Sequence, residues 1–197
     1  MLSYRKLAMR VLGRPLHTGG GIDSPRPASQ RAAALVLTAA MLTTLAAPAF
    51  AKTWYIENGD ITISAGKTEG TNKVSQGSTT DEEDTDTVIT NNNRDTASSH
   101  TVTIDAGNDK VEVTLDNVNI KADSGSALTS NGDVTLTLKG ENHLTGGNGD
   151  TYGGDGITSS GSLTISGGTV TATGGNSTGS DGSGGSGIYS ISGAVTI

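Results

Sequence analysis

The sequence lacks cysteine altogether, so disulfide bonds cannot hold any part of it together. Aromatic residues are also scarce, with one Trp, one Phe and four Tyr in 197 residues. Glycine, in contrast, occurs 29 times, well above its average share of about 7%. A conventional core of large apolar side chains is therefore in short supply. The composition predicts either partial disorder or a thin, regular core, stabilised by strand hydrogen bonds, close packing or bound cations.

Basic residues are few after the first quarter of the chain. From residue 52 onward there are seven Lys and Arg against 19 Asp and Glu, which gives a net charge of −12. Nucleic-acid-binding surfaces need clusters of Lys and Arg to neutralise phosphates. We therefore expect no nucleic-acid partner.

Residues 1–51 have the pattern of a signal peptide. Six basic residues are followed by an apolar stretch from Ala32 to Ala47 and then by Ala49-Phe50-Ala51. The two alanines of this tripeptide fit the A-x-A cleavage rule, which predicts a mature protein that begins at Lys52. The alternative is an uncleaved membrane anchor, but the stretch is short and diluted by Ala and Thr. We expect a secreted or cell-surface protein that meets the membrane only through this segment.

Beyond residue 100 the sequence repeats a short pattern. An apolar-Thr-apolar triplet occurs four times, at Val113-Thr114-Leu115, Leu136-Thr137-Leu138, Leu163-Thr164-Ile165 and Val195-Thr196-Ile197. The last three triplets are preceded by pairs of small and apolar residues, at Ala127-Leu128, Gly156-Ile157 and Gly187-Ile188. The first three are followed by a further apolar residue, at Ile120, Leu144 and Val170. Repeats of this length with alternating strands are typical of a solenoid.

Successive triplets lie 23, 27 and 32 residues apart because one connecting segment lengthens. This segment covers residues 121–126, then 145–155, then 173–186. Insertions confined to one corner of a repeat favour a solenoid, in which they project from a single face.

The residue types fit stacked β coils. Alternate strand residues point to opposite faces, so the apolar residues of each triplet would point inward and the Thr outward. Glycines would supply the corners. We predict an all-β fold with a parallel β-helix over residues 101–197, incomplete at its C-terminus because the sequence ends within a triplet. The alternative is an antiparallel β-sandwich of short strands, which the single growing segment disfavours.

Residues 52–100 have a less regular β pattern. Trp54-Tyr55-Ile56 and Ile61-Thr62-Ile63 are predicted strands with a turn at Asn58-Gly59 between them, and Trp54 and Tyr55 are predicted to cap the first coil. The segment from Glu69 to Thr87 is polar and contains an acidic run, which is typical of a solvated loop.

Four segments carry a family resemblance: Asp105 to Ile120 (DAGNDKVEVTLDNVNI), Gly140 to Thr145, Gly154 to Ile157 and Gly161 to Ile165. They resemble the carbohydrate-binding-domain-containing β-helix proteins, which are secreted or surface proteins of anaerobic bacteria related in fold to pectate lyases. The resemblance implies a right-handed parallel β-helix, calcium sites between coils, and binding of plant-type or acidic polysaccharides. Its motifs are structural, so it assigns no individual binding residue.

Acidic residues in the connecting segments are candidate calcium ligands. They are Asp123, Asp150, Asp155 and Asp181. Stacking of the coils would bring some of them together with backbone carbonyls, the oxygen-rich environment that calcium prefers. The alternative is that they are ordinary solvated turn residues, since the glycine-rich calcium nonapeptide is matched only in part.

Aromatic and planar polar groups near the same corner are candidate carbohydrate ligands. They are Asn142, His143, Asn148, Tyr152 and Tyr189. The two tyrosines would offer stacking surfaces, and the amides would bond to hydroxyls. The alternative for the tyrosines is partial packing at the corner of a coil.

No catalytic residues are predicted, so we expect no enzyme. A lyase needs a basic residue near its metal, and after residue 110 the chain offers only Lys121 and Lys139. Asp116 and Glu141 are predicted on turns, where acidic residues are ordinary, rather than as a hydrolase pair in a cleft.

The sequence therefore predicts a protein that binds a polysaccharide or cell-surface glycan without acting on it. The main alternative is a surface adhesin or structural stalk without glycan specificity. An ice-binding type of surface is a further alternative, suggested by arrays such as Thr135/Thr137 and disfavoured because Glu112, Ser162 and Ala194 interrupt them.

Overall fold

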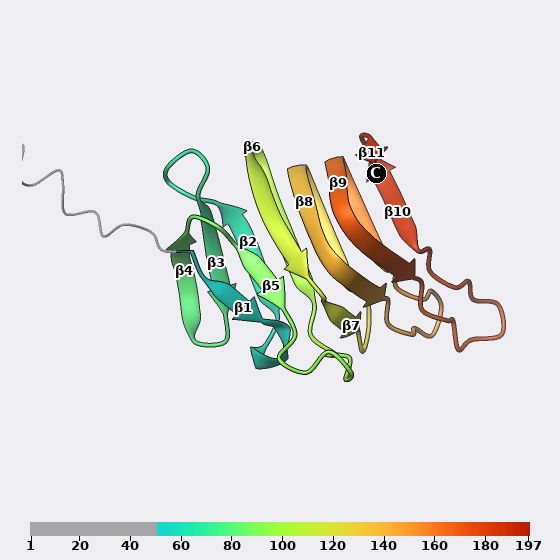
Figure 1. Ribbon diagram of the computed structural model, residues 1–197. Coiled ribbons are helices and arrows are strands. Elements are labelled where there is room, and N and C mark those ends of the chain that lie inside the picture. Colours follow the sequence, from blue (N-terminus) through green and yellow to red (C-terminus); the bar gives the residue numbers. More distant parts are fainter. Residues whose placement is uncertain (1–50) are drawn as a thin grey trace, which may run out of the picture. The chain divides into compact units, whose positions relative to one another are not determined.

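The structure is a computed structural model that describes residues 51–197 (Figure 1). The predicted signal peptide lies outside the described residues except for Ala51. Residues 51–197 form strands and one short 3-10 helix, with no α-helix. The elements are β1 (Thr53–Tyr55), η1 (Ile56–Asn58), β2 (Ile61–Ala65), β3 (Asn72–Gln76), β4 (Thr79–Asp84), β5 (Val88–Thr90), β6 (Val102–Asp116), β7 (Asn119–Lys121), β8 (Leu128–Thr145), β9 (Ile157–Thr173), β10 (Ile188–Ser192) and β11 (Val195–Thr196). Within this part of the chain, no helix is long and apolar enough to cross a membrane.

All the strands belong to one mixed, unclosed sheet. Its main order is β10-β9-β8-β6-β2-β3-β4. In this order, β10, β9, β8 and β6 each run parallel to the next strand. At the end of the sheet, β3 pairs antiparallel with β2, and β4 pairs antiparallel with β3. The all-β prediction is confirmed.

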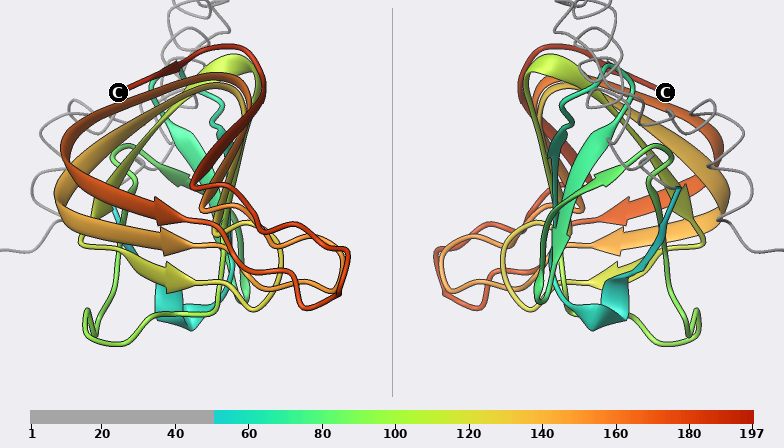
Figure 2. Two further views of the ribbon diagram at one scale, coloured as in Figure 1. Left: turned by 90° about the vertical axis from the view of Figure 1, so that its right-hand side faces the viewer. Right: turned by 90° about the vertical axis from the view of Figure 1, so that its left-hand side faces the viewer.

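The long strands β6, β8 and β9 lie in register and bend together (Figure 2). The bends divide β8 into three straight parts, which we call legs: the first is Leu128–Asn131, the middle Val134–Leu138 and the last Glu141–Thr145. The residues of each leg pair one by one with residues of the neighbouring strands. The bend between the first two legs occurs at Gly132, which pairs with Gly161, and both have a positive φ, +81° and +126°. Only glycine adopts this backbone geometry readily, so it fixes the same corner in successive strands.

Inward-pointing side chains form continuous apolar columns across the parallel strands. Leu128 and Ile157 of the first legs are fully buried, as are Val134 and Leu163 of the middle legs. Burying each such side chain contributes roughly 1.5–3 kcal/mol. The alternation of buried and exposed residues in β8 matches the prediction that the apolar residues point inward and the Thr outward.

The pairing corrects the predicted alignment of the triplets. Leu136-Thr137-Leu138 lies beside Val113-Thr114-Leu115, as expected. Leu163 pairs with Val134 instead of Leu136, so this repeat is two residues longer than the triplet spacing indicates. Consistently, Leu144 pairs with Ala172 and not with Val170. Within β8 the apolar-Thr-apolar triplet occurs twice, around Thr135 and around Thr137. Only the strand pairing shows that the triplet around Thr135 lies beside the one around Thr164.

One prediction for residues 52–100 is wrong. The segment from Glu69 to Thr87 is not a solvated loop, because it contains the antiparallel hairpin of β3 and β4 and the buried Asp84. Strands do lie on both sides of Asn58-Gly59, as predicted, but they do not pair with each other, since β1 pairs with β5 while β2 pairs with β3 and β6. Trp54 is buried at 2% exposure, whereas Tyr55 is 40% exposed.

Candidate functional site

The lengthening segments stack on one another and project from one corner of the sheet (Figure 2). We call residues 122–127, 146–156 and 174–187 together the loop stack. Backbone hydrogen bonds run through it from glycine to glycine: Gly147 donates to Gly125, Gly154 to Gly147, Gly175 to Gly154 and Gly185 to Gly175, at 2.7–2.8 Å. A Cβ atom at Gly154 would overlap the carbonyl oxygen of Gly125. The loops can approach this closely only because side chains are absent.

The predicted carbohydrate ligands do not form one site. Asn148 and Tyr152 lie in the loop stack, where Tyr152 is 73% exposed and the Asn148 side-chain oxygen accepts a 2.9 Å hydrogen bond from the Asn176 backbone. His143 lies on the last leg of β8, beside Thr171, and is exposed. Tyr189 lies on β10, beside Thr158 of a first leg. The first and last legs are different sides of the bent strands, so sequence proximity to the corner does not bring these residues together.

Asn142 is not available to a ligand. It is fully buried, and its side-chain oxygen accepts a hydrogen bond from the Val118 backbone at 2.9 Å. Its amide nitrogen donates to the carbonyls of Lys139 and Thr169, each at 3.2 Å. The side chain thus satisfies backbone groups of three neighbouring segments, a structural role that removes Asn142 from the candidate glycan surface.

The four candidate calcium ligands are likewise spread along the loop stack. Both oxygens of Asp155 are occupied, by the Ser186 backbone N–H at 2.7 Å and the Thr158 hydroxyl at 2.8 Å. Asp150 accepts from Thr178, and Asp181 is exposed. Within residues 51–197, no three His, Asp or Glu side chains are grouped as metal ligands would be.

Asp123 and Asn148 share a small hollow beside the loop stack. Its volume is about 390 Å³, and Lys121, Ser99 and Ala97 also line it. The hollow thus brings a predicted metal ligand, Asp123, together with a predicted carbohydrate ligand, Asn148.

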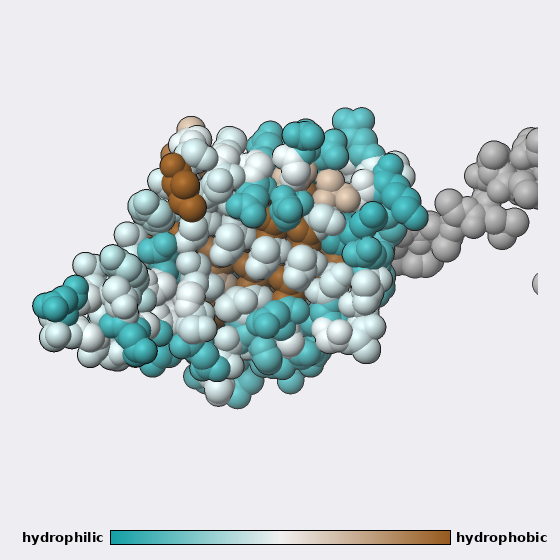
Figure 3. Space-filling model, turned by 180° about the vertical axis from the view of Figure 1, so that it is seen from behind, coloured by the Kyte–Doolittle hydropathy of each residue, from teal (hydrophilic) through white to brown (hydrophobic). Residues whose placement is uncertain are grey.

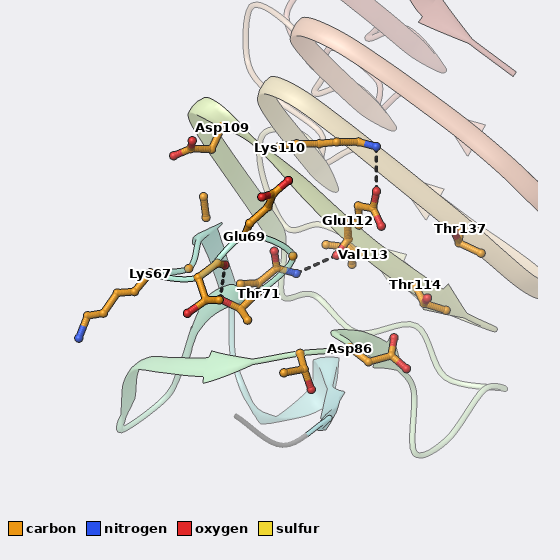
Figure 4. A pocket seen from close by; sticks show the side chains of 16 residues that line it. Lys67, Glu69, Thr71, Asp86, Asp109, Lys110, Glu112, Val113, Thr114 and Thr137 are labelled. Atoms are coloured by element: carbon orange, nitrogen blue, oxygen red, sulfur yellow. Dashed lines mark hydrogen bonds and ion pairs between the residues drawn. The ribbon is translucent and has the colours of Figure 1, made fainter. Parts of the chain in front are cut away.

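A larger open groove lies at the other end of the sheet, with a volume of about 800 Å³ (Figure 4). One wall is the turn 66–71 between β2 and β3, and the other is residues 109–114 of β6. Asp86 and Thr137 complete it. We call this feature the groove.

Buried hydrogen bonds hold the two walls together. The amide nitrogen of Asn72, which is 6% exposed, donates to the Glu112 carbonyl at 2.7 Å and to the Thr87 hydroxyl at 2.9 Å. The Thr71 hydroxyl lies 3.1 Å from the Glu83 carboxylate, which also accepts from the backbone of Lys67. The groove is therefore built on strands and an anchored turn.

Charged side chains line the groove unevenly. Lys110 forms a 2.8 Å ion pair with Glu112, and the hydrogen bond and charge of Glu112 raise the pKa of Lys110 above its usual value. Lys67 points away from the groove (Figure 4). Within residues 51–197, the carboxylates of Glu69, Asp86 and Asp109 have no hydrogen-bond or ion-pair partner.

The groove opens toward outward-facing hydroxyl residues of the sheet. Thr114 and Thr137 lie side by side, and Thr135 and Thr164 continue the row that begins at Glu112. Ser162 does not interrupt this row, since it pairs with Asp133. Figure 3 shows a face on which residues of intermediate hydropathy lie among hydrophobic ones in the middle, with a further hydrophobic group near the upper left and hydrophilic residues gathered toward the rim.

Sequence reasoning missed the groove because its walls are about 40 residues apart in the chain, at 66–71 and 109–114. The only signal was the acidic run, which was assigned to a loop. Comparisons of the chain with protein-family models, with curated proteins and with solved structures give no match.

Proposed function

We propose that the chain is a secreted or cell-surface protein that binds a carbohydrate in the groove without catalysis, and that its strands form a right-handed parallel β-helix. The groove carries this proposal, because hydroxyls and carboxylates line an open space large enough for several sugar units. Such groups match the hydroxyl donors and acceptors of a glycan. The fold proposal is supported by the residue-for-residue parallel pairing of β6, β8 and β9 and by corners that coincide at Gly132 and Gly161.

A binding role rather than catalysis is supported by the state of Lys110. A lysine that removes a proton from substrate needs a lowered pKa, so that it is neutral at working pH. The pairing with Glu112 raises the pKa of Lys110 instead, which keeps it charged. Lys110 is thus suited to orient Glu112 and bind hydroxyls, not to act as a base.

Calcium remains a proposal for the loop stack. Asp123, Asp150 and Asp181 retain carboxylate oxygens that could face a cation, whereas Asp155 is committed to Ser186 and Thr158. A melting curve that rises with calcium, and rises less after Asp150→Asn, would support it. An unchanged curve would leave these residues as solvated turn carboxylates.

Hydrogen exchange of the full-length chain, with and without glycans that score in an array, tests the main proposal. We expect slower amide exchange in residues 66–71 and 109–114. Slower exchange confined to the loop stack would instead place the site at Asn148 and Tyr152. If no glycan binds, the alternative of an adhesin or structural stalk is favoured.

A further inference from the structure

The charge of the groove indicates which glycans it can accept. Three carboxylates, of Glu69, Asp86 and Asp109, have no partner among the described residues. Two lysines line the groove. The charge of Lys110 is paired with that of Glu112, and Lys67 points away from the groove (Figure 4). From residues 51–197, a ligand in the groove therefore meets three unpaired carboxylates, whereas neither lining lysine offers it an unpaired positive charge.

Such a surface opposes the acidic polysaccharides that the family resemblance implies. A uronate unit would bring another carboxylate beside Glu69 or Asp109 without a cation to pair with it. A glycan with free amino groups would instead donate charge-assisted hydrogen bonds to the same carboxylates. A neutral glycan would bind only through hydroxyls, which leaves these carboxylates without a charged partner.

The remaining lining favours a sugar over a basic peptide. Only Ala65 and Val113 among the sixteen lining residues are apolar, and Val113 is 2% exposed. Peptide recognition normally uses apolar or aromatic pockets for side chains. Thr68, Thr114 and Thr137 offer hydroxyls, which suit a hydrophilic chain rich in hydroxyls.

We propose that the groove selects a polysaccharide with free amino groups, such as a β-1,4-linked glucosamine polymer, over neutral and uronic-acid polysaccharides. This inference rests on the proposed function, since it names the glycan class of the same groove.

The test uses three hexasaccharides with one β-1,4 backbone that differ only at C2: glucosamine, N-acetylglucosamine and glucose. A galacturonate hexamer and hexalysine complete the set. Calorimetric titration of the full-length chain at low salt should show about tenfold tighter binding of the glucosamine hexamer than of either neutral hexamer, because several exposed ion pairs of modest strength combine. High salt should weaken this preference, and the galacturonate hexamer should not bind.

Two double variants with the same change in net charge separate the groove from general attraction to an acidic protein. Glu69→Gln with Asp109→Asn should remove most of the preference for the amine, whereas Asp95→Asn with Glu141→Gln, at two exposed carboxylates outside the groove, should leave it. If both double variants lose this preference equally, the inference is overturned. It is also overturned if hexalysine binds as tightly as the glucosamine hexamer.

The outcomes also separate this inference from the proposed function. If neutral or galacturonate hexamers bind as well as the glucosamine hexamer, the amine preference is wrong while carbohydrate binding stands. If none of the four hexasaccharides binds, the proposed function fails and the inference fails with it.

Discussion

The indole N–H of Trp54 donates a 2.7 Å hydrogen bond to the carboxylate of Asp84, which is fully buried. The other Asp84 oxygen accepts from the backbone of Lys52 and of Asp86, each at 3.1 Å. One side chain from β4 thus joins the first described strand to the antiparallel hairpin. The acidic run contains this residue, so part of its charge serves the fold.

Replacing Asp84 by Ala should therefore lower the free energy of unfolding by about 1–3 kcal/mol, because buried donors lose their acceptor. Chemical denaturation measures the change. Glu82→Ala is the matched control, since Glu82 makes only an exposed ion pair with Lys52, and it should cost at most about 1 kcal/mol. Equal effects of the two changes would contradict the structural role of Asp84.

The inward and outward positions of β8 should respond differently to charge. Leu138→Asp places an unpaired carboxylate in the core, where Leu138 is 5% exposed, and should cost about 3–5 kcal/mol. Thr137→Asp, at the exposed neighbouring position, should change stability by roughly 0.5 kcal/mol or less. Similar shifts in melting temperature would contradict the assignment of faces.

The loop stack should not tolerate a methyl group between its layers. Gly154→Ala forces Cβ against the Gly125 carbonyl, and the resulting displacement should cost about 1–3 kcal/mol. At Gly184 the added Cβ would lie 3.3 Å from the Gly175 carbonyl oxygen, a contact that a small shift relieves. Gly184→Ala should thus be mild in the same thermal denaturation. A harmless Gly154→Ala would mean that the layers separate easily.

Glu57 should make stability depend on pH in the acid range. Burial opposes ionisation of Glu57, but backbone hydrogen bonds from Asn93 and its neighbours outweigh it and hold the pKa below the usual 4.5. The ionised carboxylate therefore stabilises the fold fully above pH 4.5, and this contribution disappears as pH falls through the lower folded-state pKa. Glu57→Gln should have a lower free energy of unfolding than the parent chain at neutral pH. This difference in free energy should shrink as the pH is lowered. A difference that widens on acidification would refute the direction of the shift.

The repeat was predictable because its signal is local. Leu128, Ile157 and Ile188 occupy equivalent places before successive triplets, and the structure pairs Ile157 with both of the others, as expected. The alignment of the triplets was not predictable. Apolar residues flank both Thr135 and Thr137, and a shift of two residues keeps the same faces inward, so the sequence pattern does not distinguish the two registers.

The candidate site depended on contacts distant in the chain. Nothing in the sequence around Asp109 indicates that the turn at Gly70 lies across from it. Likewise, Asn142 looks like an ordinary polar residue near a corner, and only its three backbone partners show that it is structural.

The glycine contacts of the loop stack determine how well these loops tolerate insertions. Each layer is held by main-chain bonds to the layer beneath, such as Gly175 to Gly154, so a longer loop needs no additional apolar core to support it. Lengthening a loop adds little closure entropy, because the cost grows only with the logarithm of its length. An insertion between Ser180 and Asp181, at the outer turn, should therefore leave the bonds from Gly179 to Asp150 and from Ser183 to Thr151 in place, with little penalty to the strands that support the loop.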